Sequence, residues 1–149
     1  MKKKVFWSPA ILLLAFPLVH PFGPVKQQRA STQLTADPAV LPLLEKACMN
    51  CHSQQTSWPP YSYVPPLSWA IEKDVAEARQ HMDFSKWNEY SAEEKRDLLA
   101  RIGTEVRNRQ MPLPRYLLLH PEARLSEEER QTIYEWTKTQ RRALRNDRE

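Results

Sequence analysis

Glycine and cysteine are both scarce in this sequence of 149 residues. Its only glycines are Gly23 and Gly103, too few for a glycine-rich phosphate loop or a GxGxxG turn. Nucleotide-binding folds of those kinds are therefore excluded, as are sheets that depend on many glycine-based tight turns. The two cysteines, Cys48 and Cys51, are too few for a framework of disulfides.

Net charge is also low once the first residues are set aside. The formal net charge is +4, from 22 Lys and Arg against 18 Asp and Glu, and three of the cations are Lys2, Lys3 and Lys4. Basic side chains alternate with acidic ones along the rest of the chain. This pattern is typical of solvated helix faces rather than of a nucleic-acid-binding surface, so no nucleic acid partner is expected.

The first 25 residues are typical of an export segment. A cationic start precedes a mostly apolar run that ends at Val25. No clear small-x-small cleavage site precedes Lys26, and the run is long enough to cross a bilayer if it is left uncut. We therefore predict either a signal peptide or an N-terminal membrane anchor over 1–25, and a linker over 26–36. Both place the domain 37–149 in the periplasm or otherwise outside the cytoplasm.

The first predicted helix starts at Asp37 and Pro38, an N-cap followed by the first helical position. Apolar side chains then recur at helical spacing as far as Cys51. Pro42 lies inside this run and leaves the exact start open. The polar, aromatic and proline-rich stretch 53–67 comes next, and its proline pairs exclude it from a helix interior.

Three further helices are predicted from capping residues and apolar stripes. The opening signals are Ser68, the capping box of Ser91 with Glu94, and the capping box of Ser126 with Glu129. Apolar spacing places Met82, Leu99 and Trp136 on the buried faces of these helices. The third helix ends at the Met-Pro-Leu-Pro sequence 111–114. The chain therefore belongs to the all-α class, with about four helices and essentially no sheet.

Cys48-Met49-Asn50-Cys51-His52 is a CxxCH motif at the end of the first predicted helix. Two thiols at this spacing can add to the two vinyl groups of one haem, and the adjacent histidine then lies under the iron as its proximal ligand. A thioredoxin-like CxxC needs a preceding strand, a zinc site needs two further ligands, and a disulfide leaves His52 unexplained. The motif thus favours one covalently attached haem c, held by Cys48, Cys51 and His52.

A haem iron with one histidine has a sixth position for a second ligand. Met111 is the best placed candidate, because its loop contains prolines that stiffen the backbone after the third helix. His120 is the second choice, and a weak or open sixth site is a further alternative. Met82 completes an apolar helix stripe and is predicted to pack in the core.

Aromatic residues gather just after the CxxCH motif, around two proline pairs. Trp58 and Tyr61 are the nearest of them. Aromatic rings cover the apolar face of a haem, and indole N–H or phenol O–H groups can bond a propionate. We predict that Trp58 and Tyr61 line the haem pocket, and that Trp87 and Trp136 pack in the core.

These motifs, in this order, resemble those of the bacterial haem-binding-domain family of small exported mono-haem c-type cytochromes, from about Pro38 to about Trp136. The matching segments are Cys51-His52-Ser53, Thr56-Ser57-Trp58-Pro59-Pro60-Tyr61-Ser62, Pro66-Leu67-Ser68-Trp69, Asp74-Val75, Phe84-Ser85-Lys86-Trp87, Met111-Pro112, Tyr116, and the run 120–126. The resemblance implies a cytochrome c-like bundle wrapped around one haem, with His52 proximal and Met111 distal. The sequence departs from the family at Pro60, where a second Trp is usual, and at Arg109, where a Gly commonly precedes the Met-Pro pair.

Electron transfer is the function that these features favour. A His/Met pair keeps the iron low-spin, and thioether ligation raises its potential relative to two histidines. No carboxylate pair or distal base suggests catalysis, so we expect an electron carrier or haem-binding module with a redox partner protein, rather than an enzyme. The alternatives are a haem-based sensor with a weak or open sixth site, and a haem-carrying accessory subunit of a membrane oxidoreductase. Membrane association through the N-terminus would favour the last.

Overall fold

A computed structural model describes Leu34 and residues 36–146 of the chain. The predicted export segment, and the predicted linker apart from residues 34 and 36, lie outside these described residues. None of the helices in the described part is both long and apolar enough to span a membrane.

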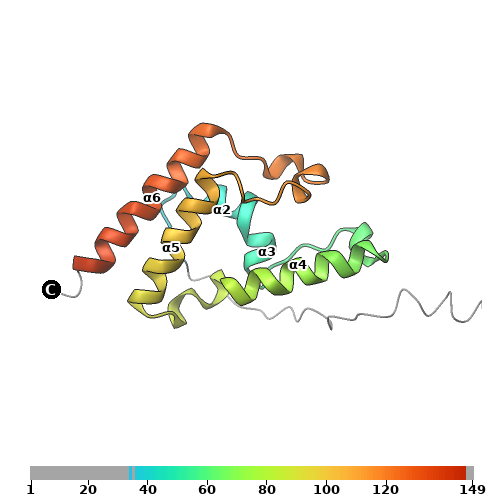
Figure 1. Cartoon of the computed structure of the whole chain (residues 1–149), viewed down its shortest axis with the longest axis horizontal. Coiled ribbons are helices and arrows are strands. Elements are labelled where there is room, and N and C mark those ends of the chain that lie inside the picture. The colour runs from blue at the N-terminus through green and yellow to red at the C-terminus, as the bar shows by residue number, and fades with distance from the viewer. Residues whose placement is uncertain (1–33, 35, 147–149) are drawn as a thin grey trace, which may run out of the picture.

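Three long helices dominate the structure, and no strand occurs in the described residues (Figure 1). They are α4 (Leu67–His81), α5 (Ala92–Arg107) and α6 (Glu127–Asn146). Helices α5 and α6 pack along each other, and the segment that carries the cysteines runs from their side of the molecule to α4 (Figure 1). The predicted all-α class is confirmed.

The CxxCH motif lies on a helical run of three short parts. These are α2 (Leu41–Leu44), η2 (Glu45–Met49) and α3 (Asn50–His52), and η2 is a π-helical turn. The α-helix begins at Leu41 rather than at Pro38. Asp37 nonetheless caps the turn that leads into it: its Oδ1 accepts from the N–H of Ala39 at 2.8 Å, and its carbonyl accepts from the N–H groups of Val40 and Leu41 at 2.8 and 3.0 Å. Pro42 fits within the first helical turn, where its missing N–H breaks no helical hydrogen bond.

Helix α4 begins one residue earlier than its predicted cap. Pro66 is the N-cap, and no side chain caps this end. Ser68 lies inside the first turn and is buried, so its prediction as the cap is wrong. The N–H of Ser68 donates to the carbonyl of Val64 at 3.0 Å, so the backbone satisfies one of the first-turn donors that a capping side chain would otherwise serve. The predicted apolar face is confirmed, since Val75 and Met82 are buried.

Both predicted capping boxes are present. At the start of α5, the N–H of Glu94 donates to Oγ of Ser91 at 3.2 Å, and the N–H of Ser91 donates to Oε2 of Glu94 at 2.7 Å. The corresponding distances between Ser126 and Glu129 at the start of α6 are 3.1 and 2.7 Å. These reciprocal bonds satisfy backbone N–H groups that a helix start leaves unpaired, and so they fix where α5 and α6 begin.

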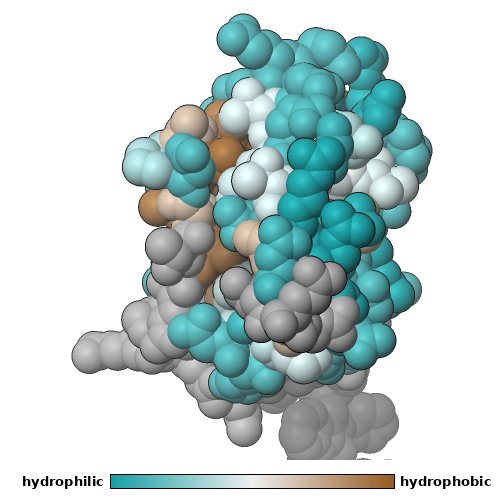
Figure 2. Space-filling view, turned by 90° about the vertical axis from the view of Figure 1, so that its left-hand side faces the viewer, coloured by the Kyte–Doolittle hydropathy of each residue, from teal (hydrophilic) through white to brown (hydrophobic). Residues whose placement is uncertain are grey.

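The core lies between the α5–α6 pair and the cysteine-bearing helical run. It contains Leu34, Val40, Leu44, Met49, Met82, Phe84, Trp87, Leu99, Ile102, Val106, Leu125, Ile133 and Trp136. The predictions that Met82, Trp87 and Trp136 pack in the core are thus confirmed. The end of the molecule where α5 and α6 lie presents mostly hydrophilic side chains, with apolar residues showing along one edge (Figure 2).

Candidate functional site

The two cysteines are free thiols on neighbouring turns of one helical run. Burial, reinforced by the nearby Cys51, raises the pKa of the Cys48 thiol to about 12. Burial also raises the pKa of Cys51 to about 11; Asp74 adds to this rise and Arg79 opposes it. Both thiols are therefore neutral at physiological pH, and neither is joined to the other in a disulfide.

His52 follows directly on the same turn, and one of its ring nitrogens is held by the backbone. Its Nδ1 lies 3.1 Å from the carbonyl oxygen of Met82. A carbonyl can only accept, so Nδ1 carries the proton and Nε2 keeps a lone pair for a metal. Burial lowers the pKa of His52 and so favours the neutral ring. A neutral imidazole fixed by a carbonyl is the usual form of a metal-ligating histidine.

The carbonyl that holds His52 belongs to a turn with its own hydrogen bonds. The buried carboxylate of Asp83 accepts from the N–H of Ser85 at 2.9 Å and from Nε2 of Gln54 at 2.6 Å. The backbone N–H of Gln54 donates in return to Oγ of Ser85 at 2.9 Å. The segment after the CxxCH motif is thus bonded to the turn between α4 and η4 (Phe84–Glu89). Sequence reasoning missed Gln54 and Asp83.

Arg79 of α4 makes a second connection to the same segment. Its Nε donates to the carbonyl of Ser53 at 2.9 Å, and its Nη2 donates to Oγ1 of Thr56 at 2.7 Å. The hydroxyl of Ser53 in turn donates to the carbonyl of Met49 at 2.7 Å. These bonds fix the backbone that leaves His52, and the sequence carried no local signal for Arg79.

Met111 lies on the loop after α5, on a segment separate from the CxxCH helix. Helix α5 ends at Arg107, before the predicted Met-Pro-Leu-Pro stop. The reason is Arg109, whose φ of 59° is left-handed and turns the chain out of the helix. Glycine adopts this conformation most readily. Arg109, which stands where the resembled family commonly has a glycine, therefore occupies a backbone position that favours glycine. Met111 itself is half-buried.

The segment after Met111 is fastened to the elements around the motif by side chains. Arg115 contacts the carboxylate of Asp74 on α4 through two hydrogen bonds, at 3.0 and 2.6 Å. Nδ2 of Asn50, inside the CxxCH motif, donates to the hydroxyl of Tyr116 at 3.1 Å. This segment contains η5 (Tyr116–Leu118) and η6 (Pro121–Ala123), and it therefore lies against both the motif and α4.

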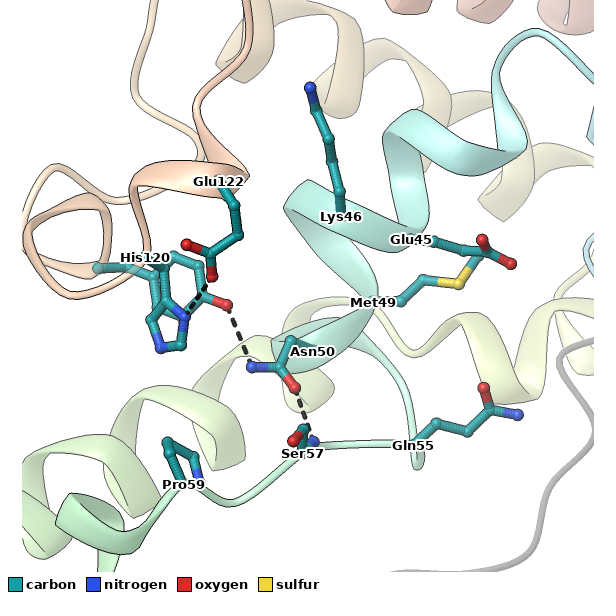
Figure 3. A pocket seen from close by; sticks show the side chains of 10 residues that line it. Glu45, Lys46, Met49, Asn50, Gln55, Ser57, Pro59, His120 and Glu122 are labelled. Carbon is teal, nitrogen blue, oxygen red and sulfur yellow. Dashed lines mark hydrogen bonds and ion pairs between the residues drawn. The ribbon is translucent and has the colours of Figure 1, made fainter.

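Both ring nitrogens of His120 have protein partners. Its Nε2 is hydrogen-bonded to the hydroxyl of Tyr61. Its Nδ1 lies 2.8 Å from a carboxylate oxygen of Glu122 (Figure 3). The ring also stacks on Tyr116, with centroids 4.2 Å apart. A carboxylate can only accept, so Nδ1 carries the proton, and Nε2 of the neutral ring then accepts from the O–H of Tyr61. Burial, then repulsion from Glu122, raises the pKa of Tyr61. An iron bond to His120 would require one of these contacts to break.

A cavity of about 360 Å³ lies beside the CxxCH helix (Figure 3). Its lining residues are Glu45, Lys46, Met49, Asn50, Gln55, Ser57, Pro59, Tyr116, His120 and Glu122. The two variable residues of the motif are among them, whereas Cys48, Cys51 and His52 are not. The cavity thus lies on a face of the helical run other than the one formed by the thiols and the imidazole.

The structure brings three of the six predicted site residues together on one helical run: Cys48, Cys51 and His52. Met111 lies on its own loop, and Trp58 and Tyr61 are half-buried in the segment after the motif. No group of three or more His, Cys, Asp or Glu within Leu34 and 36–146 is arranged to hold a metal ion. The zinc alternative therefore gains no support from the described residues.

The donor set fits a haem held through the CxxCH motif. It offers two free thiols at the CxxC sequence spacing and an imidazole whose Nδ1 is bonded to a carbonyl, so that Nε2 is the ring nitrogen that keeps a lone pair. A family model described as a haem-binding domain matches residues 11–139. No curated protein and no solved structure shows a significant match. Because the family match covers most of the chain, this protein is a member of the haem-binding domain family.

Proposed function

We propose that the protein carries one covalently attached haem c and transfers electrons outside the cytoplasm. The observation that carries the proposal is the hydrogen bond between His52 Nδ1 and the Met82 carbonyl, beside two free thiols. It leaves Nε2 as the ligand atom and holds the ring in one orientation. The haem, when bound, supplies an iron that is reduced and oxidised by one electron.

The chain's own residues then have distinct roles. The sulfur atoms of Cys48 and Cys51 form thioethers with the two vinyl groups, each S–H proton passing to a vinyl carbon. His52 is the proximal ligand, and Met111 is the distal ligand. Trp58 and Tyr61 line the pocket. The bonds of His120 to Tyr61 and Glu122 favour Met111 over His120, because ligation by His120 would sacrifice one of them.

Location and partners form part of the same proposal. The N-terminal segment acts as a signal peptide or as a membrane anchor, and the domain works in the periplasm or an equivalent compartment. The partner is a redox protein that exchanges electrons with the haem. We propose a carrier or haem-binding module rather than an enzyme.

The first experiment tests attachment and ligation together. The full chain is exported alongside a haem-attachment system, and haem is detected on the denatured polypeptide. Covalent haem in the wild type, and its loss in the double variant C48S/C51S, is the expected result. Haem that separates from the denatured wild type would contradict the c-type assignment.

The second experiment identifies the distal ligand from absorption spectra. We expect a far-red sulfur-to-iron band in the oxidised wild type, its loss in Met111→Ala, and its retention in His120→Ala. A band that survives Met111→Ala would show that Met111 is not the ligand. A high-spin spectrum without the band in the wild type would favour the sensor alternative.

A further inference from the structure

The carbonyl of Met111 is held by a buried arginine on another helix. Arg130, in the first turns of α6, is only 7% exposed. Its Nη1 donates to the carbonyl oxygen of Val106 at 2.9 Å and to that of Met111 at 3.2 Å. One guanidinium nitrogen therefore joins the last turn of α5 to the residue proposed as the distal ligand.

Met111 is fixed from its other side by α5 itself. The N–H groups of Gln110 and Met111 both donate to the carbonyl of Glu105, at 2.9 and 3.2 Å. The N–H of Met111 is thus bonded to α5 and its carbonyl to Arg130 of α6. With both backbone groups held, the remaining freedom of Met111 lies mainly in its side chain. A fixed backbone limits the positions that the sulfur of this side chain can reach.

The charge of Arg130 has no acidic partner within the described part of the chain. Its hydrogen bonds go to the two carbonyl groups, and no carboxylate of these residues forms an ion pair with it. A buried guanidinium costs free energy unless its donors are satisfied. The carbonyls at the C-terminal end of α5 carry partial negative charge, which compensates part of this cost. Apolar packing alone would not require a charged residue here.

We infer that Arg130 is the positioning residue for the distal ligand: it holds the Met111 loop so that the sulfur stays on the iron. The inference rests on the proposed ligand role of Met111. It assigns Arg130 no contact with the haem, because its hydrogen bonds go to the backbone. Loss of these bonds should make the sulfur easier to displace from the iron.

The experiment measures how easily an added ligand replaces the sulfur. Full-length haem-loaded protein is titrated with imidazole, and loss of the far-red band is followed in wild type, Arg130→Gln, Arg130→Lys and the control Arg141→Gln. Arg141 is exposed on the same helix, so its removal changes charge alone. We expect Arg130→Gln to bind imidazole roughly tenfold more tightly than wild type, as loss of a charged hydrogen bond would give. Arg130→Lys should lie between them, and Arg141→Gln should match wild type.

A merely structural role is separated by a second readout. Denaturant unfolding, followed by far-ultraviolet circular dichroism, reports global stability for the same proteins. A lower unfolding midpoint with unchanged imidazole affinity in both Arg130 variants would overturn the inference. A wild type without the far-red band would instead overturn the ligand role of Met111, and the inference with it. If Arg130→Gln does not fold, Arg130→Lys decides the question by the same titration.

Discussion

Nδ1 of His52 lies 3.1 Å from the carbonyl oxygen of Met82, the C-cap residue of α4. The two residues are far apart in sequence, and the bond makes the orientation of the imidazole depend on the turn that follows α4. That turn is held by Asp83, whose carboxylate is buried and accepts two hydrogen bonds. The histidine proposed as the proximal ligand is thus supported by a layer of polar contacts outside the CxxCH motif.

Asp83→Asn should destabilise the haem-loaded protein by about 1–3 kcal/mol. An amide has one carbonyl oxygen, so either the N–H of Ser85 or Nε2 of Gln54 loses its acceptor. Denaturant unfolding measures the loss, and Asp97→Asn, an exposed change on α5, should stay within about 0.5 kcal/mol of wild type. Asp83→Ala removes both acceptor oxygens, so combining it with Gln54→Ala should cost less than the sum of the two single changes, because both break the bond between Gln54 and Asp83. Strict additivity would count against this bond.

Arg109→Gly should stabilise the protein by about 0.5–1 kcal/mol. The left-handed φ of 59° strains any residue with a β-carbon, and glycine relieves that strain at some cost in unfolded-chain entropy. The ion pair lost with Glu127 is exposed on both sides and contributes little. Arg109→Ala is the matched control: it removes the same ion pair but keeps the strain, so its stability should stay within about 0.5 kcal/mol of wild type. Equal midpoints for the two variants in urea unfolding would refute the strain argument.

Gly103→Ala should destabilise the protein, although alanine favours helices. A β-carbon at this position would lie 2.7 Å from Oγ1 of Thr137 and 3.3 Å from a ring carbon of Tyr134, where α5 meets α6. Thr137 is buried, and its hydroxyl is bonded to the carbonyl of Tyr134 at 2.7 Å, so it has little room to move. Overpacking of about 1–3 kcal/mol should exceed the helical gain of about 1 kcal/mol.

Thr137→Ala provides the test of that steric explanation. Removing the hydroxyl takes away the closest contact, so Gly103→Ala should cost less in the Thr137→Ala background than in wild type. Thermal or denaturant unfolding of the four proteins completes the cycle. An identical cost in both backgrounds would mean that the contact with Thr137 is not the cause.

The helices and the CxxCH motif could be predicted because their signals are local. Each capping box joins residues three apart, and each apolar stripe repeats with the helix period, so Ser91–Glu94 and Ser126–Glu129 could be found from the sequence. The prediction of Ser68 as a cap is wrong because Pro66 already occupies the N-cap position of α4. Asp37 does cap, but it caps a turn, and the α-helix starts only at Leu41.

The supporting contacts of the site could not be predicted because they join distant parts of the chain. The helices η5 and η6 lie between Met111 and Arg130 in the sequence. The helices α4 and α5 lie between Tyr61 and His120. No periodic pattern encodes which donor meets which carbonyl. Such pairs follow from the packing of helices, which is decided by many weak apolar contacts together.

Glu129→Gln should lower stability at neutral pH and have little effect at low pH. The carboxylate accepts from Nζ of Lys46 at 2.5 Å and from the N–H of Ser126 at 2.7 Å, which connects α6 to the CxxCH-bearing run. The bond to Lys46, followed by that to Ser126, lowers the pKa of Glu129 in the folded protein. The stabilisation is therefore complete above the unfolded pKa of about 4.3, and it is lost as pH falls through the lower folded value. The urea unfolding midpoints of wild type and Glu129→Gln should accordingly differ at pH 7, and the difference should shrink as the pH is lowered towards 3. Glu128→Gln, an exposed change in the same helical turn, should give a smaller difference at pH 7. A gap between wild type and Glu129→Gln that persists unchanged at pH 3 would show that the ionised carboxylate is not its source.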